Sequence, residues 1–273
     1  MAELEQAAWP DLYAGGSVES LVAELDWIIT DAIDNAPRSL QTRIGPSEIG
    51  IPCDRRIGYK LAGIAPVNER GIAWKPFIGT AVHEQLGAII DSFNARVPGF
   101  NEVGPRFLIE WRVPVGSING TDIDGSCDLY DRVTGTVLDW KCVGGEQLLK
   151  YKANGPGEQY RIQAHAYGRG WQRRGFKVSN VAVYFLPRDR EFDRRHVWSE
   201  PYDEQVAVKA LERVDGIAKL ATLGPGAMSM LRTADAWCRF CPNFKPGSTD
   251  LTASCPGDAA ATAPSNTLSS LIA

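Results

Sequence analysis

Apolar positions along the chain recur with two different periods, and these periods mark the predicted elements. Over residues 17–34 the apolar side chains lie three and four positions apart, and Ser17 stands where an N-cap belongs. The pattern therefore predicts a helix that Pro37 ends. A short helix is expected over 47–61, although a glycine and a proline weaken its middle. The helical period returns over 76–95.

Farther along the chain, segments of strand period alternate with segments of helical period. In chain order we expect strands over 107–115, 122–132 and 136–143, a helix over 157–175, strands over 178–186 and 192–198, and a helix over 202–223. This core order of helix, three strands, helix and strand predicts an α/β domain with a mixed sheet. We expect a helical N-terminal segment over 1–45, the main domain over 46–256 and a disordered tail over 257–273, where apolar residues are few.

Composition and charge narrow the class of protein. The 273 residues are 44% hydrophobic and 23% charged, which is ordinary for a globular protein. The acidic N-terminus lacks the basic-then-apolar pattern of a signal peptide, so a cytoplasmic protein is expected. The net charge of −4 excludes a globally basic coat for nucleic acid. It leaves room for a local basic groove, because residues 161–195 carry nine Arg and Lys against three acids, a balance of +6.

The segment from 125 to 141 carries the most informative polar pattern. If Thr134 and Gly135 form a two-residue hairpin turn, Asp128 faces Lys141 across the two strands. Side chains alternate along a strand, so four polar residues then share one face: Asp128, Tyr130, Asp139 and Lys141. Two readings are open. The face is either a solvated strand surface with a cross-strand ion pair, or a site where two carboxylates bind a divalent metal beside an ammonium group.

Four short motifs occur in a fixed order around this hairpin. They are Gly79-Thr-Ala-Val-His83, Gly125-Ser-Cys-Asp128, Asp139-Trp-Lys141 and Gln163-Ala-His-Ala-Tyr167. In this set and order the chain resembles the RecB-type nucleases of the PD-(D/E)XK superfamily, including the CRISPR-associated RecB-like exonucleases and the AddB nuclease domain. The resemblance spans residues 46–256 and implies a restriction-endonuclease-like core.

The resemblance implies a role for each residue of the hairpin site. Asp128 and Asp139 would bind Mg²⁺ or Mn²⁺, together with His83 and the backbone carbonyl of Trp140, and Lys141 would be the catalytic lysine. A neutral imidazole ligand favours Mn²⁺ over Mg²⁺. Taken alone, His83 could equally be a core or helix-surface histidine.

Residues that would contact DNA follow on the next predicted helix. The resemblance implies that Gln163 and Tyr167 contact DNA or order the active site. Arg174 lies seven residues after Tyr167 on the same stripe, so its spacing and charge make it a third candidate. The alternative for Gln163 and Tyr167 is that their side chains support the core. The alternative for Arg174 is that it belongs to a solvated charged face. Glu110 could be a further acid of the site or a strand-surface carboxylate, and no role is expected for His165.

The cysteines fall into two groups. Cys127 and Cys142 stand in apolar segments. The other four, one before the core and three after it, resemble the layout of the iron–sulfur subgroup of the same nucleases: Cys53, Cys238, Cys241 and Cys255. The resemblance implies a structural [4Fe–4S] cluster, although the thirteen residues between Cys241 and Cys255 exceed the usual gap. Structural Zn²⁺ and unrelated buried thiols are the alternatives.

Together these features predict a metal-dependent deoxyribonuclease, and specifically an exonuclease that acts in DNA recombination, repair or replication. Its DNA would have single-stranded character or free ends. The sequence contains no Walker motif, so a helicase or recombination partner would be a separate protein. The alternatives are a CRISPR-adaptation nuclease that trims DNA and a non-catalytic iron–sulfur DNA-binding protein.

Overall fold

The computed structural model describes residues 17–36, 43–68, 71–97, 102, 104–235 and 237–258. The chain divides into two compact units: Met1–Gln41 with Gly71–Phe77, and Thr42–Arg70 with Ile78–Ala273. From residue 259 on, the tail predicted to be disordered lies outside the described residues, as does Pro37. None of the helices in the described ranges is long and apolar enough to cross a membrane.

Helix α2 (Val18–Asp34) belongs to the first unit and confirms the first predicted helix. The Ser20 backbone N–H donates to the Ser17 hydroxyl at 3.2 Å, so Ser17 is the N-cap that the sequence predicts. Most apolar side chains of this helix are exposed, and Ile33 is its buried residue.

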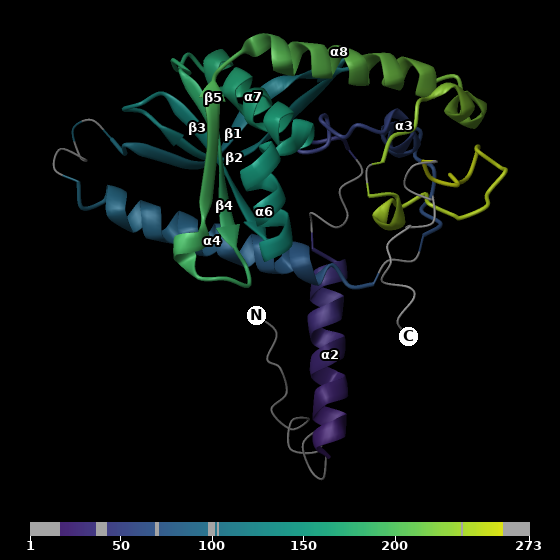
Figure 1. The fold of residues 1–273 in the computed structure, drawn as a ribbon, viewed down its shortest axis with the longest axis horizontal. Coiled ribbons are helices and arrows are strands. Elements are labelled where there is room, and N and C mark those ends of the chain that lie inside the picture. The colour runs from purple at the N-terminus through teal and green to yellow at the C-terminus, as the bar shows by residue number, and fades with distance from the viewer. Residues whose placement is uncertain are drawn as a thin grey trace, which may run out of the picture. The chain divides into compact units, whose positions relative to one another are not determined.

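The second unit contains a mixed sheet whose order is β1-β2-β3-β4-β5 (Figure 1). The strands are β1 (Phe107–Ile118), β2 (Thr121–Asp131), β3 (Thr136–Val143), β4 (Asn180–Pro187) and β5 (His196–Pro201). Only β3 and β4 run parallel, and the other neighbours are antiparallel. The predicted mixed sheet is therefore confirmed. The last strand begins at His196 rather than at 192, because residues 192–194 form a 3₁₀ turn.

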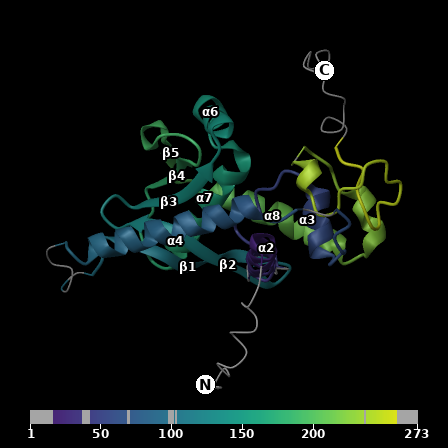
Figure 2. The same ribbon diagram turned by 90° about the horizontal axis from the view of Figure 1, so that it is seen from below.

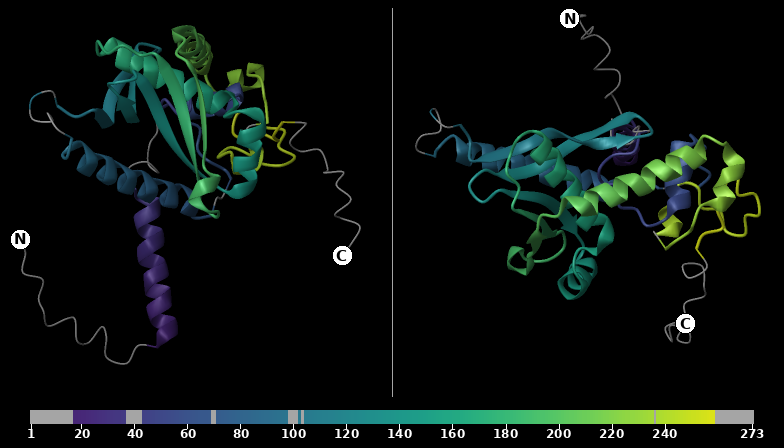
Figure 3. Two further views of the ribbon diagram at one scale, coloured as in Figure 1. Left: turned by 60° about the vertical axis from the view of Figure 1, so that its left-hand side comes forward. Right: turned by 90° about the horizontal axis from the view of Figure 1, so that it is seen from above.

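Helices cover both faces of the sheet. They are α4 (Trp74–Asn94), α6 (Gly145–Asn154), α7 (Gly157–Arg173) and α8 (Glu204–Ala221), whereas α3 (Asp54–Leu61) packs against α8. Figure 2 shows α4 crossing one face, and the two views of Figure 3 show α7 and α8 on the other. The short helix expected over 47–61 begins only at Asp54, because Gly50 and Pro52 interrupt the earlier turn. Helix α6 was not predicted.

Two apolar clusters fix these layers. The larger lies between the sheet and the helices α7 and α8, and Trp171 of α7 is completely buried in it. Gly170 permits the close approach of this helix, since a Cβ there would lie 2.6 Å from Val113 of β1. The smaller cluster consists of Leu129, Trp140 and Leu186, covered by apolar side chains of α4. The central strands are therefore covered on both faces, so a polar group on them is held in a largely dry environment.

The hairpin between β2 and β3 differs in register from the prediction. Its turn has four residues, 132–135, and the ladder pairs Tyr130 with Val137 and Asp131 with Thr136. The expected two-residue turn, which placed Asp128 opposite Lys141, is therefore wrong by two positions. The reason is the Asp131 carboxylate, which accepts hydrogen bonds from the Val133 backbone and the Thr134 hydroxyl and so stabilises the wider turn. A shift of two preserves the alternation of faces.

Candidate active site

Asp128 joins the two central strands to helix α4. Its carboxylate is buried, and its Oδ2 accepts the backbone N–H of Trp140 at 2.7 Å, just beyond the last ladder pair. The same oxygen lies 3.4 Å from Nδ1 of His83. Helix α4 therefore brings its histidine directly onto the carboxylate of β2, as the ordered motifs lead one to expect.

Glu110 of β1 completes a group of three potential ligands. Among the described residues, only His83, Glu110 and Asp128 form a set of three or more His, Cys, Asp or Glu whose ligand atoms all lie within 4.8 Å of one another. Glu110 has φ +53°, a left-handed conformation inside a strand, and its neighbours Ile109 and Trp111 keep their pairing with β2. Backbone strain of this kind concentrates at functional sites.

Asp139 and Lys141 of β3 form the second half of the site. The Nε2 of Gln163 on α7 donates to Asp139 Oδ1 at 2.9 Å, and Lys141 Nζ forms an ion pair with Asp139 Oδ2. The ammonium also lies 5.1 Å from the ring centroid of Tyr160, a cation–π contact. The aspartate is 1% exposed, so these polar partners offset the cost of its burial.

Electrostatics distinguish the two aspartates. Burial raises the pKa of Asp139 to about 6; Lys141 opposes that shift, and the charge of Asp128 adds to it. Burial also acts to lower the pKa of His83, but the contact with Asp128 outweighs it and the pKa of the imidazole is raised. Carboxylates held this closely repel one another, and a bound cation would relieve that repulsion.

The donors present fit a divalent cation. Carboxylate oxygens and one imidazole nitrogen are the ligands that Mn²⁺ and Mg²⁺ accept. The Oε1 of Gln163 is buried and has no hydrogen-bond partner among the described residues. The side chain that donates to Asp139 therefore also carries an unused acceptor oxygen. His83, Glu110 and Asp128 would hold the ion, and Asp139 stands next to them, turned toward Lys141 and Gln163.

The three residues predicted to contact DNA lie in different environments. Gln163 is 4% exposed and Tyr167 6%, so both are core-facing, and Gln163 contacts the aspartate of the site. Arg174 is the exposed C-cap of α7, and its guanidinium donates to the Arg112 carbonyl. Eleven residues of helix separate it from Gln163, or about 16 Å along the axis. His165 is fully buried and is hydrogen-bonded to Glu200 and to the Asp203 backbone, a structural arrangement.

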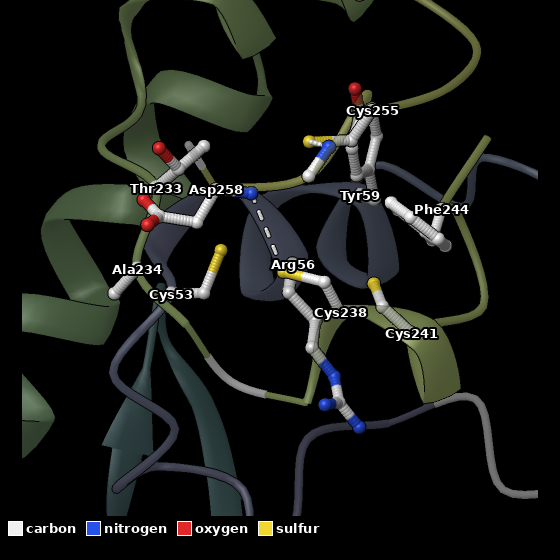
Figure 4. Close-up of a pocket in the computed structure, with 11 residues that line it drawn as sticks. Cys53, Arg56, Tyr59, Thr233, Ala234, Cys238, Cys241, Phe244, Cys255 and Asp258 are labelled. Carbon is white, nitrogen blue, oxygen red and sulfur yellow. Dashed lines mark hydrogen bonds between the residues drawn. The ribbon is translucent and has the colours of Figure 1, made fainter. Parts of the chain in front are cut away.

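Four cysteine side chains from the two ends of the unit line one pocket between α3 and the C-terminal segment (Figure 4). They are Cys53, Cys238, Cys241 and Cys255. The long gap before the last of them is closed by a parallel bridge between Phe244 and Cys255. The Cys255 backbone N–H donates to Asn243 at 2.8 Å and returns the chain to the pocket. The unusual spacing therefore does not separate Cys255 from the other three.

Hydrogen-bond donors lie close to two of these sulfurs, whereas burial raises the pKa of the Cys241 thiol. The backbone N–H groups of Asp258 and Gly257 donate to the sulfurs of Cys238 and Cys255, each at 3.4 Å. Arg55 lies 3.7 Å from the Cys255 sulfur. In the described chain no three of the sulfurs come within 4.8 Å of one another, whereas bonds of about 2.3 Å to one zinc ion would place them about 3.8 Å apart. The wider spacing suits a group larger than a single ion.

Comparison with known proteins gives matches among solved structures. No protein-family model and no curated protein matches the chain. Among solved structures it is similar to an alkaline exonuclease (LHK-Exo) from Laribacter hongkongensis, with a TM-score of 0.44 and 11% identity over 69% of this chain and 91% of that one. The same enzyme in complex with dAMP gives a TM-score of 0.40, 14% identity and the same coverage. A phage-related exonuclease from Haemophilus somnus 129PT gives a TM-score of 0.31 and 14% identity over 54% of this chain and 71% of that one.

Two residues of the site were not assigned from the sequence. Glu110 could be named only as one possible acid, since the left-handed backbone conformation that it adopts within β1 has no sequence signal. Tyr160 belongs to none of the four motifs, although its ring packs on the catalytic-lysine candidate, Lys141. Its position three residues before Gln163 on the same helix is the signal that could have found it.

Proposed function

We propose that this protein is a divalent-metal-dependent deoxyribonuclease of the RecB-like PD-(D/E)XK type, and specifically an exonuclease in DNA recombination, repair or replication. The observation that carries the proposal is the meeting of four separate elements at one point. Helix α4 supplies His83, β1 supplies Glu110, β2 supplies Asp128 and β3 supplies the Asp139–Lys141 pair. A structural ion pair alone would not require the histidine and the strained glutamate.

Each side chain has a role in hydrolysis of a phosphodiester. His83, Glu110 and Asp128 would hold the metal, and the Trp140 carbonyl is a proposed further ligand. Asp139 would add a further carboxylate beside them. The ion supplies Lewis-acid charge and lowers the pKa of water. Lys141 would orient the attacking water or stabilise the charge that develops on the phosphorane. Its contacts with Asp139 and Tyr160 hold the ammonium in place before the substrate arrives.

Gln163 and Tyr167 are better suited to ordering the site than to contacting DNA. Both side chains are almost completely buried, so they have little surface to offer a strand. Gln163 instead fixes one oxygen of Asp139 and leaves the other to Lys141. We propose that helix α7 keeps the two β3 residues in register with the metal ligands. Arg174 stays a candidate phosphate contact at the far end of that helix.

The four-cysteine pocket would hold a [4Fe–4S] cluster. The donor set is four thiols with N–H donors aimed at two of the sulfurs, and the sulfur spacing exceeds that of one zinc site. Its role would be structural, because it would tie Cys53 at the start of α3 to the end of the unit. Structural Zn²⁺ is the alternative that metal analysis tests.

The test is digestion of single- and double-stranded DNA labelled at either end, in Mg²⁺, Mn²⁺ or Ca²⁺. We expect mononucleotide release with Mg²⁺ or Mn²⁺ and none with chelator. Lys141→Ala should lower turnover by about 10²–10³-fold with an unchanged circular dichroism spectrum. Lys150→Ala, an exposed lysine on α6, is the matched control and should be unaffected. Near-normal turnover of Lys141→Ala would refute this active-site assignment.

A further inference from the structure

The connection between β4 and β5, residues 188–195, carries an exposed aromatic side chain among charges. Phe192 is 62% exposed, and the Arg195 guanidinium carbon lies 4.8 Å from the centroid of its ring. The guanidinium covers one side of an otherwise accessible ring. The ring belongs to neither buried apolar cluster, so its exposed face is accessible to a ligand.

The connection begins next to the catalytic strand. The Arg188 backbone N–H donates to the Val143 carbonyl at 2.8 Å, and Val143 lies two residues beyond Lys141, about 7 Å along β3. The Asp189 carboxylate accepts the Gly145 backbone N–H at 2.8 Å and so fixes the connection to the first turn of α6. Its base is therefore anchored within one or two nucleotide lengths of the proposed active site.

The connection carries four arginines and three acids, a net charge of +1. Of the acids, Asp189 accepts a hydrogen bond from α6, Asp193 contacts Arg194 at 3.9 Å, and Glu191 stands between Arg190 and Phe192. Neither Arg188 nor Arg190 forms an ion pair with another residue of the described chain. Arg188 and Arg190 flank Asp189, the acid that anchors the segment to α6. Both arginines therefore remain available to bind a polyanion.

We propose that Phe192, backed by Arg195, is a stacking platform for a base of single-stranded DNA, and that Arg188 and Arg190 hold the adjoining phosphates. The proposal rests on the proposed nuclease function and adds the place where the strand is held on its way to the metal. A duplex hides the faces of its bases, so only an unpaired strand can stack on the ring. Charged residues flank Phe192 on both sides, which leaves no continuous apolar patch in this segment for a protein partner.

The test is the affinity of the full-length protein for a fluorescent oligo(dT) strand, in Ca²⁺ to prevent cleavage, at several salt concentrations. Phe192→Ala should weaken binding by about 5–150-fold and leave the salt slope unchanged, since stacking releases no counterions. Phe192→Trp should restore affinity. Arg190→Ala should lower the slope by about 0.7, the value for one phosphate contact on a single strand. Duplex binding should be much less affected by Phe192→Ala.

Leu223→Ala removes an equally exposed apolar side chain, 72% exposed at the end of α8, and should leave oligo(dT) binding unchanged. Wild-type-like affinity of Phe192→Ala would overturn the stacking platform, and so would an equal loss on single and double strands. The proposed function would survive either result, provided that the wild type still binds and degrades DNA. Failure of the wild-type protein to bind or cleave any DNA would instead overturn the proposed function itself.

Discussion

Replacement of Gln163 by alanine separates an ordering role from a DNA-contacting role. The side chain donates one hydrogen bond of 2.9 Å to Asp139, a carboxylate that is 1% exposed and has no other hydrogen bond to that oxygen among the described residues. A hydrogen bond to a charged group contributes about 1.5–3 kcal/mol, and the truncated variant leaves the acceptor buried and unsatisfied. We expect this loss to move the carboxylate, together with the ion-paired Lys141.

If the whole loss appears in the transition state, turnover should fall by about 10–150-fold, the rate equivalent of that free energy. The assay is steady-state cleavage of end-labelled DNA, with kcat and KM determined separately, together with binding in Ca²⁺ at several salt concentrations. We expect kcat to fall while KM, DNA affinity and the salt slope stay close to those of the wild type.

Gln159→Ala is the matched control, because Gln159 is a glutamine of the same helix whose amide donates to the Ser47 carbonyl and not to an acid of the site. It should change stability slightly and kcat very little. An unchanged kcat in Gln163→Ala, with weaker DNA binding and a smaller salt slope, would refute the ordering role and favour the direct DNA contact.

Three further changes test other parts of the structure. His83→Ala should weaken metal affinity as well as rate, with partial rescue by high Mn²⁺ in a metal titration; an enzyme that responds to metal as before would remove His83 from the ligand set. Purified protein should be brown with broad absorbance near about 400 nm, and Cys53→Ala should lose colour and iron while Cys142→Ala keeps both; a colourless protein with stoichiometric zinc would favour the zinc alternative. Asp131→Ala should lower the free energy of unfolding by about 1.5–3 kcal/mol near neutral pH. Burial acts to raise the pKa of Asp131, but the hydrogen bonds from Arg106 and Thr134 outweigh it and lower that pKa, so the deficit in denaturant titrations should shrink as the pH falls below about 4. A deficit independent of pH would mean that the carboxylate charge is not what stabilises the turn.

The element order and the two hairpin faces could be predicted from the sequence because they depend on local periodicity. The hairpin register was predicted two positions wrong, yet Tyr130 and Asp139 still face α7, since a shift of two residues preserves the side-chain alternation. The turn could not be predicted, because the Asp131 side chain stabilises it and Arg106, which directly precedes β1, donates further hydrogen bonds to that carboxylate.

Other parts of the site depend on contacts between distant segments. The left-handed conformation of Glu110 has no signal in a single sequence, and helix α6 is short and begins at the second of two adjacent glycines. The cysteine pocket could be anticipated only through the resemblance, since no local pattern connects Cys53 to a segment about two-thirds of the chain farther on. The +6 balance of the basic run was visible in the sequence, but not which of its arginines would be left without acidic partners.

The contact between Arg55 and Cys255 spans 200 residues of chain, and this separation has a consequence during synthesis. A ribosome adds about 5–20 residues per second, so Cys53 is synthesised roughly 10–40 s before Cys255. During that interval the sheet and its helices can assemble, whereas the pocket of α3 stays open and its thiol unprotected. Closure of the pocket is therefore a late step, and the Cys53 thiol stays open to oxidation until that step is complete.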